Sequence, residues 1–517
     1  MMKTKFIIII LAMGIVGVSC KKTWLDVNTN PNTLTSSNPN FIFTAALNQT
    51  VTNAVDYNEI GSYWAGHWTQ SSSYIYSAVT FAYQFTNNNF NWWDPIYNNL
   101  GDYQYIINNA DAKGQKELKG PAQVMKAYLM QIIVDHYGNA PYSDALKGVS
   151  SLTPKFDDQK AIYEDLIKVL DTAIANIKAN PFSGALVGSD ITTAGTLKAG
   201  SSTKWIKFAN SLKLRILIRQ SRMTGRDAYI TTEIKKAVQE GTGFLDAGQD
   251  MAVNPGFVAS DGKMNPFYER WGYNAAGAIK SLARYPRPTK YLFDRLIAAN
   301  DTFRLKRLAY AKGGENANNP GVSTQAEVVS NYVGTPYGAP SGYTAPSTSY
   351  LGPSVIVKGT HNRPLYLMTA AESQFLLAEA VQRYGATLGL PNTAQQYYET
   401  GVRESFRLDG VANPVTQANV VLASGIAESD WAASPDKLKA IWFQKWLSLA
   451  NFNGAEAWAE YRRTNYPNIP ASAGAPVGQK PPVRLFYPLS ELGSNQANVN
   501  AQGTIDVFNT RIFWDVD

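Results

Sequence analysis

The chain has 517 residues, which is long enough to bury a large core without disulfides or metal ions. Hydrophobic residues make up 45% and aromatic residues 12%, and this composition excludes an intrinsically disordered chain. The 47 basic and 40 acidic residues give a formal charge of +7, and because these charges are dispersed we expect no nucleic-acid partner. Cys20 is the only cysteine and the three histidines lie far apart, so cysteine-based metal sites and HExxH zinc sites are excluded, and we expect no cofactor.

The N-terminus has the pattern of an export signal. Lys3 and Lys5 precede an apolar run over residues 6–18, which is too short to span a bilayer. Small residues lead up to Cys20, as in the lipobox of bacterial lipoproteins. We therefore predict a signal peptide over 1–19, lipidation of Cys20, a lipid-anchored tether over 20–40 and a single domain over 41–517. Two or more acyl chains anchor a protein stably to a membrane, so lipidation of Cys20 would hold this chain there.

Most of the body shows helical periodicity. Residues 162–177 carry an apolar stripe at helical spacing, and so do residues 205–216. Residues 367–381 are apolar on nearly all sides, which predicts a helix packed between two others. Ser434 and Pro435 predict the N-cap and first residue of another helix. Further helices are expected near 41–55, 94–111, 117–136, 227–240, 392–406 and 453–463.

Long segments rich in Gly, Pro, Ser and Asn separate the predicted helices. They cover 180–201, 246–288, 311–364, 464–484 and 490–507, and they exceed the usual length of a connection. Long ordered loops commonly carry function, so we expect the ligand site there. Small residues at helix crossings favour tetratricopeptide-type packing, although no strict 34-residue repeat is visible.

Catalytic chemistry has little support. GxSxG, Walker A and GxGxxG motifs are absent. Exported glycosidases use paired carboxylates, but each candidate pair here is better explained by a helix cap or a solvated helix face. These pairs are Asp157 with Asp158, Glu372 with Glu379, and Glu456 with Glu460.

Aromatic residues in polar, loop-like settings are more informative. Twelve lie within residues 57–93, and a second group, Tyr268, Trp271, Tyr273 and Tyr285, lies beside Arg270 and Arg284. A flat ring covers the apolar face of a sugar, while amides and guanidinium groups bond its hydroxyls. The alternative is an ordinary core, which we favour for Trp92, Trp93 and Tyr97. The candidate ligand-binding residues are Trp64, Trp68, Tyr76, Trp271, Tyr273 and Arg284.

Several segments together resemble the SusD/RagB family of nutrient-binding outer-membrane lipoproteins. They run in family order from Cys20 almost to the C-terminus, and as a set they are highly specific. They include WLDVNTNPN at 24–32, VDHYGNAPYSDA at 134–145, PKFDDQ at 154–159, WIKFANSLKLR at 205–215, MTAAESQFLLAEA at 368–380, NGAEAWAEYRR at 453–463 and PVRLFYP at 482–488.

The resemblance implies a mostly α fold, with a tetratricopeptide-like scaffold of helix pairs, long irregular loops and minor β structure. It implies a protein without catalysis that faces the cell exterior, binds an oligosaccharide and delivers it to a SusC-like TonB-dependent transporter. Three alternatives stay open: a peptide receptor of the same type, a structural cap that gates the barrel, and an exported glycoside hydrolase. The hydrolase would need loop acids such as Asp250, Asp261 and Glu269.

Overall fold

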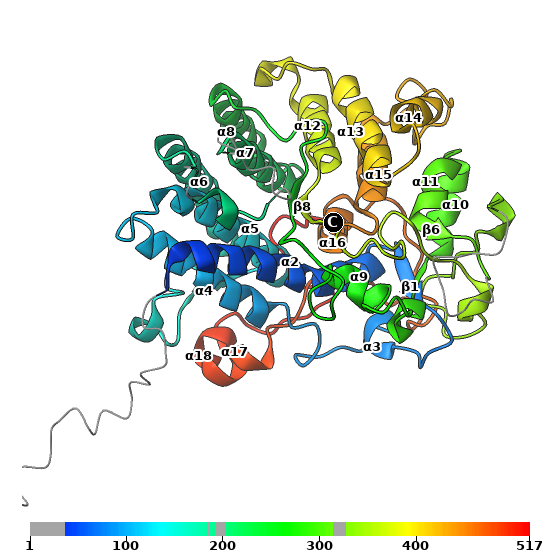
Figure 1. The fold of residues 1–517 in the computed structure, drawn as a ribbon, viewed down its shortest axis with the longest axis horizontal. Helices are drawn as coiled ribbons and strands as arrows, with labels where there is room; N and C mark the ends of the chain where they lie inside the picture. The colour runs from blue at the N-terminus through cyan, green and yellow to red at the C-terminus, as the bar shows by residue number, and fades with distance from the viewer. Residues whose placement is uncertain (1–36, 183, 185, 193–201, 314–326) are drawn as a thin grey trace, which may run out of the picture. The chain divides into compact units, whose positions relative to one another are not determined.

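The computed structural model describes residues 37–182, 184, 186–192, 202–313 and 327–517 (Figure 1). The predicted signal peptide, Cys20 and the tether as far as residue 36 lie outside the described residues. Pro39–Asp517 forms one compact unit. This unit is mostly helical with short strands, which confirms the predicted fold class.

The long helices occur where the periodicity predicts them, whereas the shorter ones were not predicted. The long ones are α2 (Pro39–Trp64), α4 (Trp93–Asn109), α5 (Lys119–Tyr137), α6 (Gln159–Ala179), α7 (Ser202–Arg219), α8 (Asp227–Gln239), α12 (Ala370–Tyr384), α13 (Ala394–Leu408), α15 (Lys437–Leu449) and α16 (Gly454–Thr464). Shorter ones are α3 (Ala78–Phe81), α9 (Pro266–Trp271), α10 (Lys290–Ala298), α11 (Thr302–Leu308), α14 (Pro414–Leu422), α17 (Leu489–Ser494) and α18 (Gln496–Asn500). Of these, α9, α17 and α18 lie wholly or largely in segments that were expected to be loops.

Side-chain caps begin many of these helices. Asp158 accepts hydrogen bonds from the backbone of Lys160 and Ala161 at the start of α6, and Thr393 forms a capping box at the start of α13. The predicted cap at Ser434 is wrong. Asp436 caps α15 instead, because its carboxylate accepts from the Lys439 N–H at 3.1 Å.

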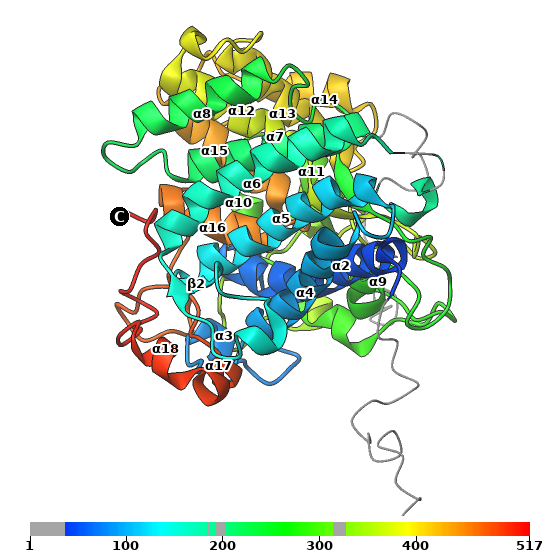
Figure 2. The same ribbon diagram turned by 90° about the vertical axis from the view of Figure 1, so that its left-hand side faces the viewer.

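Successive helices pack side by side as a scaffold of helix pairs. The helix α5 packs between α4 and α6, α6 packs on α7, and α7 packs on α8 and α12. Figure 2 shows α8, α7, α6, α5 and α4 stacked in that order. The helix α12 contacts α7, α13 and α15, which explains why it is apolar on most sides, as predicted. Figure 1 shows α16 near the centre of the ribbon, and it packs on α2, α5 and α15.

The strands are short and form four antiparallel pairs. The strand β1 (Trp68–Gln70) pairs with β5 (Pro286–Pro288), and β4 (Met251–Val253) pairs with β8 (Leu365–Met368). The pair of β2 (Ala140–Pro141) and β3 (Phe156–Asp157) and the pair of β6 (Ala309–Tyr310) and β7 (Tyr350–Leu351) complete the set among the described residues. The β1–β5 pair holds the loop that leads to β5 beside the end of α2. The β4–β8 pair holds the segment that contains β4 beside the start of α12.

The helices α2 and α16 cross in direct backbone contact. A Cβ added to Gly61 would lie 2.2 Å from the backbone carbon of Gly454, and one added to Gly454 would lie 2.2 Å from the carbonyl oxygen of Asn58. Only glycine at both positions permits this approach. The crossing fixes the segment that precedes α16, where Asn451 and Phe452 lie.

Candidate ligand-binding site

Four of the six predicted ligand-binding residues are buried. The side chains of Trp64, Trp68, Trp271 and Tyr273 are at most 2% exposed. The indole of Trp64 lies 4.7 Å from that of Trp458, centroid to centroid, and its N–H donates to the Thr80 carbonyl at 3.1 Å. Such burial favours packing, the alternative reading of these residues, and their role in ligand binding stays a prediction.

Trp68 and Trp271 belong to the same packed layer. Their rings meet edge to face at 6.5 Å, and the Trp68 N–H donates to the side-chain oxygen of Asn451 at 2.8 Å. The guanidinium of Arg270 covers Trp271 at 4.8 Å from the ring centroid. Neither ring face is open to a ligand in this conformation.

Tyr76 and Arg284 are half-buried, and they lie on two different loops. The ring of Tyr76 packs against Phe81 with centroids 6.1 Å apart. A Cβ added to Gly474 would collide with the Tyr76 hydroxyl, so the 472–478 loop closes over this ring. Arg284 ends the short 3-10 helix η6 (Ser281–Arg284), directly before Tyr285.

Trp92, Trp93 and Tyr97 pack as predicted. Trp92 and Trp93 are each 2% exposed, and Tyr97 packs against the core with its hydroxyl donating to the Pro141 carbonyl at 2.6 Å. The aromatic run over 57–93 therefore contributes mainly to the core near α2 and α4.

The candidate carboxylate pairs are structural. Glu372 accepts two hydrogen bonds from Arg215, and Glu456 and Glu460 both contact Arg219. All of these side chains are buried inside the helical scaffold. Each of these carboxylates is held in an ion pair with a buried arginine. Asp158 caps α6, and the carboxylate of Asp157 accepts from the backbone of Tyr142 and Ser143.

A surface of two aromatic rings lies where the 70–77 and 281–285 loops meet. Tyr74 and Tyr285 are half-buried and meet edge to face at 5.4 Å. The Tyr74 hydroxyl donates to the Ser281 carbonyl, and the Tyr285 hydroxyl donates to Gln70 at 3.2 Å. Burial, the largest effect, raises the pKa of Tyr285 to about 12, so its hydroxyl stays protonated at neutral pH.

The 70–77 loop, which carries Tyr74, projects an apolar side chain into solvent. Ile75 is 94% exposed at the tip of this turn. Gln70 holds the turn, because its amide donates to the Ile75 carbonyl at 2.6 Å and its oxygen accepts from the Ser77 N–H at 2.9 Å. The loop that follows η7 (Val329–Asn331) is fastened here too, since the Tyr343 N–H donates to the Ser72 hydroxyl at 2.9 Å.

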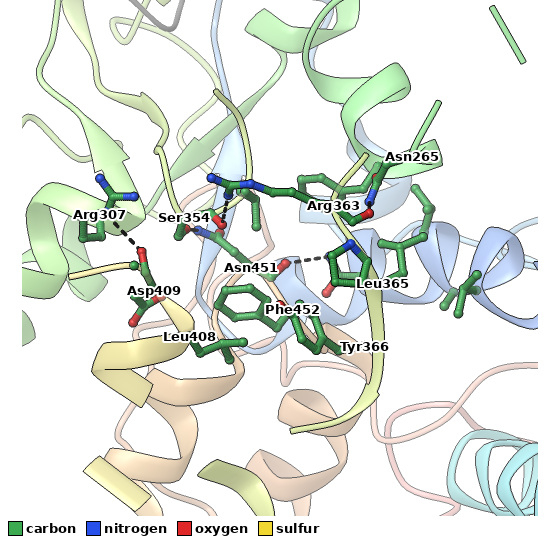
Figure 3. A pocket seen from close by; sticks show the side chains of 18 residues that line it. Asn265, Arg307, Ser354, Arg363, Leu365, Tyr366, Leu408, Asp409, Asn451 and Phe452 are labelled. Atoms are coloured by element: carbon green, nitrogen blue, oxygen red, sulfur yellow. Dashed lines mark hydrogen bonds between the residues drawn. The ribbon is translucent and has the colours of Figure 1, made fainter. Parts of the chain in front are cut away.

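A separate pocket of about 200 Å³ lies beside α2 (Figure 3). One wall is apolar, formed by Val51, Ala54 and Val55 of α2. Tyr366 of β8 and Phe452 form an opposing aromatic pair, with centroids 5.6 Å apart and planes 87° apart. The remaining lining comes from α9, α11, the end of α13, and the loops after β7 and before β8.

Two arginines supply the charge of this pocket. The Arg307 Nε donates to the Asp409 carbonyl at 2.9 Å, and Arg363 donates to the Ser354 carbonyl at 2.6 Å. Asn265 caps α9 and holds Arg363 in place, because its amide donates to the Arg363 carbonyl at 2.8 Å. The side chains of Asn265 and Asn451 are thus engaged in hydrogen bonds that support the walls of the pocket.

Sequence reasoning missed this pocket because its residues come from segments more than 300 residues apart. Arg307, Arg363, Tyr366 and Phe452 share no motif. Tyr74 and Tyr285 carried a signal, as aromatic residues in polar loops, but the same signal also marked rings that are buried.

Within the described residues, no cluster of His, Cys, Asp and Glu could hold a metal ion. In the same part of the chain, every helix is too short or too polar to cross a membrane.

Comparison with known proteins identifies the fold. The sequence model of a SusD-like family, described as "Starch-binding associating with outer membrane", matches residues 31–488. A SusD homolog from Bacteroides uniformis ATCC 8492 is 23% identical, with coverage of 92% of this chain and 100% of that one and a TM-score of 0.71.

Two further solved structures are similar over nearly their whole length. A chitin-binding SusD homolog from Flavobacterium johnsoniae is 23% identical, with 92% and 97% of the chains covered and a TM-score of 0.71. A SusD homolog from Bacteroides fragilis NCTC 9343 is 22% identical, with 93% and 99% covered and a TM-score of 0.73. No curated protein matches the chain.

Proposed function

The chain belongs to the SusD-like family of starch-binding proteins that associate with the outer membrane, and from this premise we propose that it is a lipid-anchored receptor for an oligosaccharide. Cys20 carries the lipid, and the body faces the cell exterior. The receptor delivers its ligand to a SusC-like TonB-dependent transporter and catalyses no reaction.

The surface formed by Tyr74 and Tyr285 is the observation that supports an oligosaccharide as the ligand. The two rings are half-buried and come from loops that hydrogen bonds hold together, so they are rigid and reachable at the same time. Aromatic rings in such a setting cover the apolar faces of sugars. Arg284 directly precedes Tyr285 in the chain, and in this proposal its guanidinium donates hydrogen bonds to sugar hydroxyls at the edge of this surface.

The absence of catalysis is supported by the ion pairs of the interior. Glu372, Glu456 and Glu460 each contact a buried arginine, and an acid held in this way is not available to transfer a proton to a substrate. A peptide ligand and a purely structural cap stay as outcomes of the test below.

Binding to purified protein tests the proposal. The chain from Lys21 onward is titrated by calorimetry with starch and chitin oligosaccharides and with a peptide library. We expect saturable, micromolar to millimolar binding of one glycan without turnover. The Tyr74→Ala and Tyr285→Ala variants should each bind it about tenfold more weakly. Phe41→Ala is the matched control, because Phe41 is a ring 69% exposed on α2.

The other outcomes separate the alternatives. Binding of peptides but of no glycan would favour the peptide receptor. Binding of neither, with retention on transporter-containing membranes, would favour the structural cap, and glycan turnover would favour the hydrolase. Lipidation is tested on its own: Cys20→Ser should release the protein from the membrane fraction.

A further inference from the structure

We propose that the pocket between Arg307, Arg363, Tyr366 and Phe452 binds the carboxylate-bearing unit of an acidic glycan, a uronic acid residue. This inference rests on the proposed function and names a chemical class for its ligand.

The two guanidinium groups of the pocket converge on one backbone oxygen. The Pro353 carbonyl accepts from Arg307 Nη2 at 3.4 Å and from Arg363 Nη1 at 3.1 Å. All hydrogen bonds of these two arginines within the described residues go to backbone carbonyls. In that part of the chain neither arginine has an Asp or Glu oxygen within 4.0 Å, in contrast to Arg215 and Arg219.

Asp409, the acidic residue of the lining, forms no ion pair with either arginine in the described part of the chain. It offers Arg307 its backbone carbonyl, and Figure 3 shows its carboxylate turned away from Arg307. The carboxyl group is buried, and neither oxygen has a hydrogen-bond partner among the described residues. Burial raises the pKa of Asp409 well above its usual value and outweighs the opposing charges of Arg304 and Arg307, so the ionised form is disfavoured.

The pocket therefore holds two adjacent positive charges, and among the described residues neither guanidinium forms an ion pair with a carboxylate. Burial lowers the pKa of Arg363, and the like charge of the neighbouring Arg307 adds to that effect. A carboxylate accepts two parallel N–H bonds from a guanidinium, and in a half-buried site it would relieve this repulsion.

The size and the apolar lining of the pocket indicate which kind of molecule bears the carboxylate. Drug-sized ligands fill pockets of about 300–1,000 Å³, so a pocket of about 200 Å³ accommodates one sugar unit rather than an oligomer. The ring pair of Tyr366 and Phe452 offers an aromatic surface to the C–H face of that unit.

The test uses the mature chain with Cys20→Ser, titrated calorimetrically with glucuronate, galacturonate and their oligomers, and with glucose and galactose as uncharged counterparts. We expect binding of a uronate and at least about tenfold weaker binding of the neutral sugar, because charge-assisted hydrogen bonds would be lost. Arg307→Gln and Arg363→Gln should each weaken uronate binding about tenfold or more.

Arg403→Gln is the matched control, since Arg403 is a partly exposed arginine on α13 outside the pocket. Leu408→Trp, which fills the pocket without removing a charge, provides a second variant in case the arginine variants do not fold, and it should abolish uronate binding. Circular dichroism and the melting temperature verify the fold of each variant.

The outcomes distinguish the inference from the proposed function. Binding of a neutral glycan, unaffected by uronates and by the pocket variants, would overturn the inference and leave the proposed function in place. Binding of peptides through their carboxylates, with the same dependence on both arginines, would overturn both. Uronate binding that is lost in the pocket variants and kept in Arg403→Gln would establish the inference.

Discussion

Arg463 of α16 and Glu379 of α12 form a two-armed ion pair in the interior: Nη1 lies 2.8 Å from Oε1 and Nη2 lies 2.7 Å from Oε2. Both side chains are fully buried. Arg463 also contacts Glu460, which in turn contacts Arg219 and Lys445. This network joins α7, α12, α15 and α16, and together with the Arg215–Glu372 ion pair it explains two of the three candidate carboxylate pairs, Glu372 with Glu379 and Glu456 with Glu460.

Removing the centre of this network should be costly. Arg463→Met leaves the buried carboxylate of Glu379 with Arg383 as its remaining partner, and we expect a loss of about 3 kcal/mol or more in the free energy of unfolding. Urea denaturation measures it. Arg403→Met, which breaks a partly exposed pair with Glu399, should cost less than about 1 kcal/mol. Equal effects of the two variants would contradict the structural role of the network.

The crossing of α2 and α16 predicts a sharp difference between two glycines. Gly61→Ala places a methyl group 2.2 Å from the Gly454 backbone, so the helices must separate, and we expect a loss of more than about 3 kcal/mol or failure to fold. Gly101→Ala on α4 meets nothing within 4 Å and should stabilise the protein by about 0.5–1 kcal/mol. Thermal melting of both variants decides this; a tolerated Gly61→Ala would mean that the helices lie farther apart.

Burial of Trp271 predicts a loss of stability when it is truncated. Trp271→Ala removes a ring that is 2% exposed, and we expect a loss of about 3–5 kcal/mol. Tyr74→Ala, at the half-exposed surface, should cost much less stability and reduce glycan binding. If Trp271→Ala instead kept its melting temperature and lost glycan binding, the original prediction of a ligand-binding Trp271 would be right.

Glu59 predicts a pH dependence of folding. Burial, the largest effect, raises its pKa from 4.5 to about 7 and outweighs the nearby charge of Arg270. Between these two values the folded protein holds a proton that the unfolded chain has released, so stability falls as pH rises through this window, by up to about 3 kcal/mol in all.

The measurement is the urea midpoint of the wild type and of Glu59→Gln from pH 4.5 to 8. The wild type should lose stability relative to Glu59→Gln as the pH rises. A constant difference between the two proteins across the range would show that the pKa of Glu59 is not raised.

The sequence by itself determined the long helices and the family. Apolar stripes at helical spacing, such as residues 162–177, predict the long helices because every such helix must bury one face, and the apolar run at 367–381 already indicates that α12 is covered on most sides. The ordered set of motifs from Cys20 to residue 488 indicated the family, because these motifs are distributed over the whole helical scaffold.

Only the tertiary structure decided which polar and aromatic side chains face solvent. Trp68 and Tyr74 both lie in polar segments with similar composition, yet β1 carries Trp68 into the core and the following turn carries Tyr74 to the surface. Likewise, Arg307 and Arg363 become a pair only because both reach the Pro353 carbonyl. Exposure and convergence depend on contacts between distant segments, and local sequence does not encode those contacts.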